Sequence, residues 1–137
     1  MTSSLVICTI PEDVKDTLKK FRFSKSQSTN VLVLKISKEE QVFAIEEHFE
    51  DVTLEEVRDE LPSQQPRFVL ISWCKKHDDG RSSYPLSLVY YSPTGSSPEL
   101  KMLYAGSKNH LIQECQLTKN MEIRDLEDLT EELLESK

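Results

Sequence analysis

The chain has 137 residues, of which 37% are hydrophobic and 30% are charged, and its formal net charge is -7. This length suits one domain that buries about two-thirds of the surface exposed by the unfolded chain, so we predict a single domain over residues 1–137. The excess of acidic residues argues against general nucleic-acid binding, because contact with phosphates needs a positive surface. With only 3 Gly and 6 Pro, the composition is typical of a globular rather than a disordered chain.

The first predicted helix begins at Pro11, because proline suits the first helical position, where no N–H is needed. Apolar residues then recur at i, i+4 and i+7, at Val14, Leu18 and Phe21, so one face of the helix is expected to pack against a core. Lysines and an arginine occupy much of the remaining surface, a pattern that more often marks a solvated face than a binding site.

Two strands and a short helix are predicted next. The segments VLVLKI (31–36) and QVFAIEEHF (41–49) have the composition of strands, and the short stretch between them suits a hairpin turn. Thr53 and Glu56 have the spacing of a capping box that opens a helix, and Pro62 predicts that this helix ends at the preceding residue.

A second hairpin is predicted from two longer segments. RFVLISWCKK (67–76) and SSYPLSLVYYS (82–92) are its expected strands, and Asp79 followed by Gly80 is a strong turn signal between them. Pro85 cannot donate to a ladder, so it is expected near the start of its strand or at a bulge.

The last third of the chain predicts a helix, a strand and a helix. Ser97 is the expected N-cap of the longest helix, which extends to about Leu117, and MEIR (121–124) is expected to form a short strand. Asp125 is the expected N-cap of a final helix whose apolar side consists of Leu126, Leu129 and Leu133.

The predicted order of elements is α-β-β-α-β-β-α-β-α, which indicates an α+β fold. The two hairpins imply a mostly antiparallel sheet, whereas the last strand follows a helical crossover and should lie parallel to its neighbour. The segments 31–36 and 68–73 are apolar on both faces, so we expect helices to cover both sides of the sheet.

Residues that could carry catalysis or bind a metal are few. Cys74 and His77 have the outline of a C-x-x-H pair, but no second pair completes a zinc site and no third group is evident to orient a nucleophile. Asp78 and Asp79 are more often turn residues than paired catalytic acids. We therefore predict a binding protein rather than an enzyme, with no cofactor and no metal.

The cysteines Cys8, Cys74 and Cys115 are odd in number and show no disulfide framework, which favours small core residues in a reducing compartment. The N-terminus lacks the basic region of a signal peptide, and no apolar run approaches the ~18 residues of a membrane span. These features predict a cytoplasmic protein with neither a membrane nor a nucleic acid among its partners.

The longest predicted helix has two faces with apolar residues. At about 100° per residue, the face expected to meet the core gathers Leu100, Leu103, Tyr104, Ser107, Leu111, Glu114 and Cys115. The opposite face has an apolar centre and a polar rim, formed by Lys101, Met102, Ala105, Lys108, Asn109, Ile112 and Gln116. This second face is either buried under another part of the chain or covered by a partner, and its polar rim favours a partner.

Several segments resemble the actin-depolymerising-factor homology (ADF-H) family. The helix SPELKMLYAGSKNHLIQ (97–113) is similar to the central actin-binding helix of that family, and the likeness extends from FRF (21–23) to EIRDLEDLTEELL (122–134). The segments FRF, QPRFV, HDDGR, SYPL and MLYAGSKN resemble the glia maturation factor branch more closely than cofilin. The resemblance implies the ADF-H fold, in which a central mixed, mostly antiparallel sheet is sandwiched between helices.

This branch implies a regulator of branched actin filaments. Cofilins bind and sever actin filaments, whereas glia maturation factors bind the actin-related protein 2/3 complex, inhibit nucleation and debranch filaments. Glu99 stands where cofilins usually carry a lysine and Ile112 where they continue with lysines, so both changes lower the positive charge that would meet acidic actin. The alternative is a cofilin-like protein that binds and severs actin filaments directly.

The resemblance also implies a monomer with two binding surfaces. The first would dock on an actin-related subunit and consists of Ser3, Ser4, Leu5, Lys101, Met102, Ala105, Lys108, Asn109, Ile112, Asp125, Glu127 and Asp128. The second would touch the first actin subunit of the daughter filament and consists of His77, Asp78, Asp79 and Arg81. The basic end of the first helix would supplement one of the two surfaces with Lys19, Lys20 and Arg22.

A phosphate on Ser3 or Ser4 would add about -1.5 to -2 charge beside the acids of the first surface, so we expect phosphorylation there to weaken docking. The expected location is the cytoplasmic actin cytoskeleton, in cortical branched networks or actin patches, with the nucleus as a second location.

Overall fold

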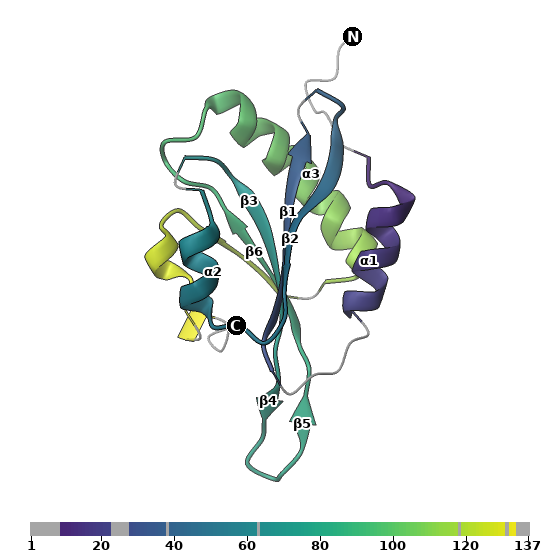
Figure 1. Ribbon diagram of the computed structural model, residues 1–137, viewed down its shortest axis with the longest axis vertical. Helices are drawn as coiled ribbons and strands as arrows, with labels where there is room; N and C mark the ends of the chain where they lie inside the picture. Colours follow the sequence, from purple (N-terminus) through teal and green to yellow (C-terminus); the bar gives the residue numbers. More distant parts are fainter. Residues whose placement is uncertain are drawn as a thin grey trace.

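The computed structural model, shown in Figure 1, describes residues 9–22, 28–37, 39–62, 64–117, 119–130 and 132–133. The predicted site residues Ser3, Ser4 and Leu5 lie outside the described residues, as does Cys8, and so does the side chain of Arg22.

A five-stranded sheet forms the centre of the molecule (Figure 1). Its strand order is β2-β1-β3-β6-β7, with β1 at Asn30–Ser37, β2 at Val42–Phe49, β3 at Arg67–Ser72, β6 at Leu86–Tyr91 and β7 at Lys119–Ile123. Neighbouring strands are antiparallel except for β6 and β7, which are parallel. This confirms the predicted mixed sheet, whose last strand arrives by a helical crossover.

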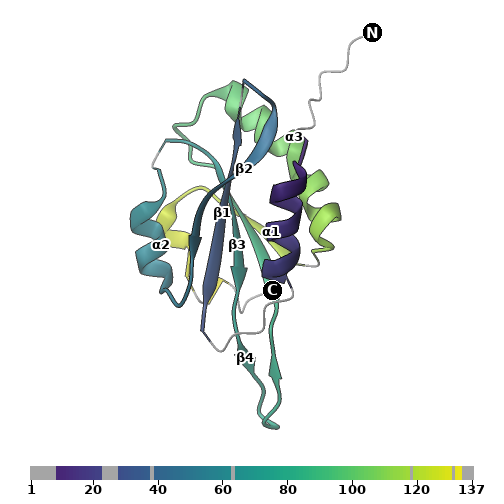
Figure 2. The same ribbon diagram turned by 45° about the vertical axis from the view of Figure 1, so that its right-hand side comes forward.

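Helices cover both faces of the sheet, as predicted. Helices α1 (Glu12–Arg22) and α3 (Pro98–Cys115) lie on one face, and α2 (Leu54–Glu60) lies on the other with the short 3-10 helix η1 (Leu126–Asp128), as Figures 1 and 2 show. Each face buries its own apolar cluster.

Within the described part of the chain, no helix combines the length and the apolar character that crossing a bilayer requires.

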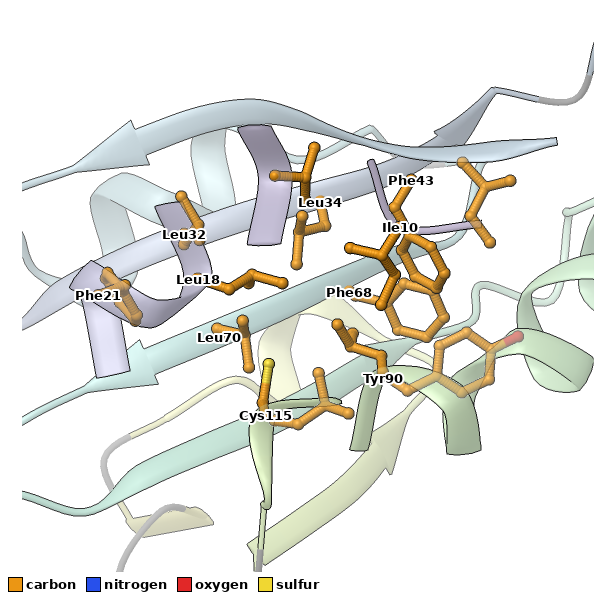
Figure 3. Packing of buried hydrophobic residues seen from close by; sticks show 14 of the residues in the cluster. Ile10, Leu18, Phe21, Leu32, Leu34, Phe43, Phe68, Leu70, Tyr90 and Cys115 are labelled. Atoms are coloured by element: carbon orange, nitrogen blue, oxygen red, sulfur yellow. The ribbon is translucent and has the colours of Figure 1, made fainter. Parts of the chain in front are cut away.

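The cluster beneath α1 and α3 is built around aromatic side chains (Figure 3). The ring of Phe68 lies 5.7 Å from that of Phe43, 5.4 Å from that of Tyr90 and 5.3 Å from that of Tyr104, measured between centroids. Such ring pairs add about 0.5–1.5 kcal/mol beyond their apolar burial. Because Tyr104 belongs to α3, the aromatic group holds the first half of that helix against the sheet.

The first helix begins one residue later than predicted. The Lys15 N–H donates to the Pro11 carbonyl at 2.9 Å, so Pro11 occupies the N-cap and Glu12 is the first helical residue. The predicted apolar face is confirmed, because Val14, Leu18 and Phe21 are all buried.

The second predicted hairpin is interrupted where its strands leave the body of the protein. Strand β3 ends at Ser72, and the chain resumes pairing in a separate two-stranded sheet of β4 (Lys75–Lys76) and β5 (Ser82–Ser83). Pro85 has no N–H to donate, and its carbonyl accepts the Trp73 N–H at 3.4 Å. The tip of the hairpin therefore projects beyond the sheet, as Figure 1 shows.

A single continuous helix from Asp125 to Leu133 was the wrong expectation. Residues Leu126–Asp128 form one 3-10 turn, the Asp125 side chain makes no capping hydrogen bond, and Leu129 is extended. Leu129 is fully buried, and its carbonyl accepts a hydrogen bond from Arg58 Nη1 at 2.6 Å. This bond takes the place of the backbone hydrogen bond that the carbonyl would accept in a continuous helix. Tertiary packing against α2 therefore overrides the local helical pattern.

Candidate functional site

Both ends of α3 are capped, and the N-cap is the predicted Ser97. The Ser97 hydroxyl accepts the Leu100 N–H at 3.2 Å, and Pro98 occupies the first turn. At the other end Gln116 adopts a left-handed conformation with φ 53°, and the Leu117 N–H donates to the Ile112 carbonyl at 3.0 Å. These local bonds position an 18-residue helix on the sheet.

The inner face of α3 agrees with the predicted core face except at one residue. Tyr104, Ser107, Leu111 and Cys115 are buried, and the partly buried Leu100 and Leu103 pack against the first cluster. Glu114, however, is exposed at the edge of this face, where its carboxylate lies 4.0 Å from the Lys15 ammonium of α1. A carboxylate there stays hydrated, whereas burial in the apolar core would be costly.

The outer face of α3 presents an exposed methionine. Met102 is 64% exposed. Among the described residues it is the only large hydrophobic side chain that is exposed. Ala105 and Asn109 are also exposed, whereas Ile112 is half-buried and packs against the first cluster. The predicted outer stripe therefore has its apolar centre at Met102 and Ala105, and Ile112 belongs partly to the core.

Tyr90 connects the sheet to the lysines of this outer face. Its hydroxyl donates to the Lys101 carbonyl at 3.5 Å, and the Lys108 ammonium lies 5.8 Å from the centre of its ring, within cation–π range. The Lys101 ammonium itself donates to the Thr94 carbonyl at 3.3 Å. Two of the predicted site lysines are thus held by contacts within the protein.

Two tyrosines beneath α3 predict how stability depends on pH. Burial raises the pKa of Tyr104 above the ordinary tyrosine value of 10.0, although the Ile36 N–H and the Arg67 side chain act to lower it, and burial also raises the pKa of Tyr90. As pH rises above about 10, the unfolded chain therefore loses these protons first. We expect the tyrosines to contribute fully to stability below that pH and to lose this contribution as pH rises through their folded-state pKa values.

Urea unfolding between about pH 8 and pH 11 measures this effect. The Tyr104→Phe variant should lose less unfolding free energy across that range than the wild-type protein, because one of the linked protons is gone. An equal loss in the two proteins would contradict the assignment.

Two adjoining hollows extend from α3 across the end of β7. The α3 hollow is lined by Tyr90, Ser92, Thr94, Lys101, Ala105, Glu122 and Arg124. The turn hollow is lined by Gln64, Tyr91, Pro93, Thr94, Gly95, Arg124, Asp125, Leu126 and Glu127. Because Thr94 and Arg124 line both, we treat the two hollows as one feature, the Arg124 groove.

The Arg124 groove brings together predicted site residues that are distant in sequence. Lys101 and Ala105 of α3 line one part of it, and Asp125 and Glu127 line the other. Asp128, which follows Glu127 in the chain, is also exposed. Arg124 itself was missed by sequence reasoning, because its position beside α3 depends on the parallel pairing of β6 with β7.

The tip of the second hairpin lies at the end of the molecule away from the start of α3 (Figure 1). His77 Nε2 lies 2.9 Å from the Ser83 hydroxyl, and the Arg81 guanidinium pairs with the Asp79 carboxylate at 2.6 Å. Asp78 is exposed at the same turn. The predicted turn at Asp79 and Gly80 is confirmed, since the Gly80 N–H donates to the His77 carbonyl at 3.0 Å.

The basic end of α1 faces two different hollows. Lys19 lines a hollow between α1 and α3 together with Cys115, whereas Lys20 lines another together with His48 and Asp51. Both lysines are exposed. They therefore do not form one patch with a common orientation.

The residues considered for catalysis or metal binding are dispersed. Cys74 is half-buried and Cys115 is buried. Among the described residues, His, Cys, Asp and Glu side chains nowhere gather in a group of three or more that could hold a metal ion. What the molecule offers is an exposed helix face with a polar groove beside it, which suits binding.

Comparisons with known proteins match the whole chain. The family model described as "Cofilin/tropomyosin-type actin-binding protein" matches residues 7–137. Glia maturation factor beta of Mus musculus is 49% identical over 137 residues, which cover 100% of this chain and 96% of that protein. Glia maturation factor of Drosophila melanogaster is 44% identical over 131 residues, which cover 96% and 95% of the two chains.

Solved structures agree with these sequence matches. The solution structure of glia maturation factor from Caenorhabditis elegans superposes with a TM-score of 0.86 at 60% identity, covering 100% of this chain and 99% of that chain. The crystal structure of Streptomyces griseoflavus cofilin superposes with a TM-score of 0.78 at 19% identity, covering 95% and 96%, and so shares the fold.

Proposed function

The chain belongs to the ADF-H family of actin-binding proteins, in its glia maturation factor branch, and on this premise we propose that it binds the actin-related protein 2/3 complex, inhibits nucleation and promotes filament debranching. The family consists of actin-binding regulators, and its members act in the cytoplasmic actin cytoskeleton. For this chain we propose cortical branched networks or actin patches, and the nucleus as a second location. We propose that the protein acts as a monomer.

The observation that carries the proposal is the exposed apolar centre of α3. Met102 is 64% exposed on a helix whose opposite face is buried in the core. Lys101, Lys108 and Asn109 surround it with polar groups. An apolar anchor with a polar rim is the usual anatomy of a protein–protein interface core, so this face supports docking into a groove of an actin-related subunit.

The charge at the start of α3 argues against binding to the acidic surface of actin. Glu99 lies exposed in the first turn of the helix, where it also favours the positive end of the helix dipole. A lysine at this position would add attraction to an acidic partner, whereas a carboxylate reduces it. A cofilin-like severing activity is the alternative that this charge argues against.

The proposed mechanism breaks no covalent bond. The protein would bind an open or strained branch junction more tightly than a closed one, and this difference in affinity would shift the junction toward dissociation. We propose that the hairpin tip with His77, Asp78, Asp79 and Arg81 contacts the first actin subunit of the daughter filament. We also propose that phosphorylation of Ser3 or Ser4 opposes docking, because it adds negative charge to a segment that takes part in the first binding surface.

Imaging of pre-formed branched actin networks tests this function. Addition of the purified protein is expected to increase the rate of branch loss while filament length between branches stays constant. Severing of unbranched filaments, together with strong co-sedimentation at low micromolar protein, would support the cofilin-like alternative. An unchanged rate of branch loss would overturn the proposal.

A further inference from the structure

The Arg124 groove changes its charge along its length. On the α3 side, Lys101 and Arg124 contribute two positive charges against the single carboxylate of Glu122. On the turn side, Asp125 and Glu127 contribute two carboxylates against Arg124. A groove of this kind attracts opposite charges at its two ends.

The walls of the groove are held by contacts within the protein. The Ser92 N–H donates to the Ile123 carbonyl at 2.9 Å, which continues the β6–β7 ladder up to Arg124. The Lys101 ammonium is bonded to the Thr94 carbonyl across the α3 hollow. At the rim, the Gln64 side chain packs so closely on Gly95 that a β-carbon there would overlap it. The groove is therefore formed before any partner binds, which lowers the entropic cost of binding.

Arg124 is the residue in the groove best suited to recognise a carboxylate. Within the described residues no ion pair engages its guanidinium, which is exposed between the two hollows. The planar guanidinium can donate two parallel hydrogen bonds to a carboxylate. The Lys101 ammonium, held on the same side, adds positive charge without competing for that geometry.

We propose that the Arg124 groove receives an extended segment of the partner whose carboxylate binds between Lys101 and Arg124 and whose lysine or arginine binds against Asp125 and Glu127. This inference rests on the proposed function, because it supplies the polar contacts beside the Met102 anchor. It makes Arg124 and Glu127 determinants of specificity, whereas Met102 supplies apolar affinity.

The test measures the affinity of the full-length protein for purified actin-related protein 2/3 complex at several salt concentrations. Arg124→Gln and Glu127→Gln are each expected to weaken binding about tenfold and to reduce its salt dependence. Met102→Ala should weaken binding without changing the salt dependence. Lys35→Gln removes one exposed positive charge outside the groove and serves as the matched control, which should bind like the wild-type protein.

The Glu127→Gln variant distinguishes specific binding in the groove from a general electrostatic attraction between the two molecules. If the partner were simply acidic, loss of one carboxylate would strengthen binding, and Lys35→Gln would weaken it as much as Arg124→Gln does. Either result, or wild-type affinity for Arg124→Gln, would overturn the inference. If the wild-type protein does not bind the complex, the proposed function fails, and the same variants are measured with monomeric actin. Weakening by both groove variants there supports the groove, and any other result overturns it.

Discussion

A Met102→Glu variant is expected to lose at least about a hundredfold in affinity for the actin-related protein 2/3 complex while its stability stays the same. A hundredfold loss corresponds to about 2.8 kcal/mol, which is within the range of a central interface anchor and of burying an unpaired charge. Met102 is 64% exposed in the free protein, so the new carboxylate would be hydrated until a partner covers it. Binding is measured with labelled protein, and stability by thermal unfolding.

Asn120→Glu is the matched control for this variant. It places the same carboxylate at an exposed position of β7, outside the proposed surface, and should bind like the wild-type protein. Substitution of Ile112 by aspartate is a poorer test, because Ile112 packs against the first core cluster and its loss would perturb the fold. Wild-type affinity of a folded Met102→Glu variant would show that this helix face does not dock.

A Glu46→Ala variant is expected to lose about 3 kcal/mol of unfolding free energy, because it leaves a buried arginine without its carboxylate. The two Glu46 oxygens accept bonds from Arg67 Nε at 2.9 Å and from Nη2 at 3.1 Å, and the Arg67 side chain is 9% exposed. Arg67 retains bonds to the Pro66 carbonyl and to Gln65, so the expected loss is at the lower end for a broken buried pair. Urea unfolding at neutral pH measures it.

The double variant Glu46→Leu with Arg67→Met is the control for this loss. Replacement of a buried ion pair by apolar residues of similar size is often nearly neutral, so the double variant should recover most of the lost free energy. If it is as unstable as Glu46→Ala, the ion pair is not the source of the effect. The single variant should also loosen the first half of α3, since Arg67 interacts with Tyr104.

A β-bulge explains how Glu46 reaches Arg67. The pairing of β1 with β2 shifts between Val33 and Leu34, so that Val33 faces Glu47 and Leu34 faces Ile45, which leaves Glu46 as the extra residue. A bulge redirects a side chain and interrupts an exposed edge strand. The sequence QVFAIEEHF carries no local signal for this shift, because the register depends on the partner strand.

Most secondary structure could be predicted because its causes are local. The capping box of Thr53 and Glu56 and the Ser97 cap form between residues three positions apart, and both are present as predicted. The inward face of α3 follows from the helical period, and the resemblance of α3 to the ADF-H helix indicated the family. Errors arose where distant residues compete, as at Leu129, whose carbonyl accepts from Arg58 instead of forming a helical bond.

The candidate site was predicted less completely than the fold. Periodicity identified Met102, Ala105 and Ile112 as one outward stripe, but packing against the first cluster leaves Met102 exposed and partly covers Ile112. The Arg124 groove could not be predicted at all, because it combines side chains from α3, β6 and the end of β7.

By itself, the sequence determined the capped helices, the two hairpins, the amphipathic α3 and the membership of an actin-binding family, because each depends on residues close together in the chain or on a continuous pattern. Tertiary structure alone decided the Glu46–Arg67 pair, the break at Leu129 and the joining of α3 to Asp125 and Glu127 through Arg124. The physical reason is strand register: which side chains meet across a sheet depends on pairing between segments far apart in sequence, and a shift of one residue reverses the face on which each side chain lies.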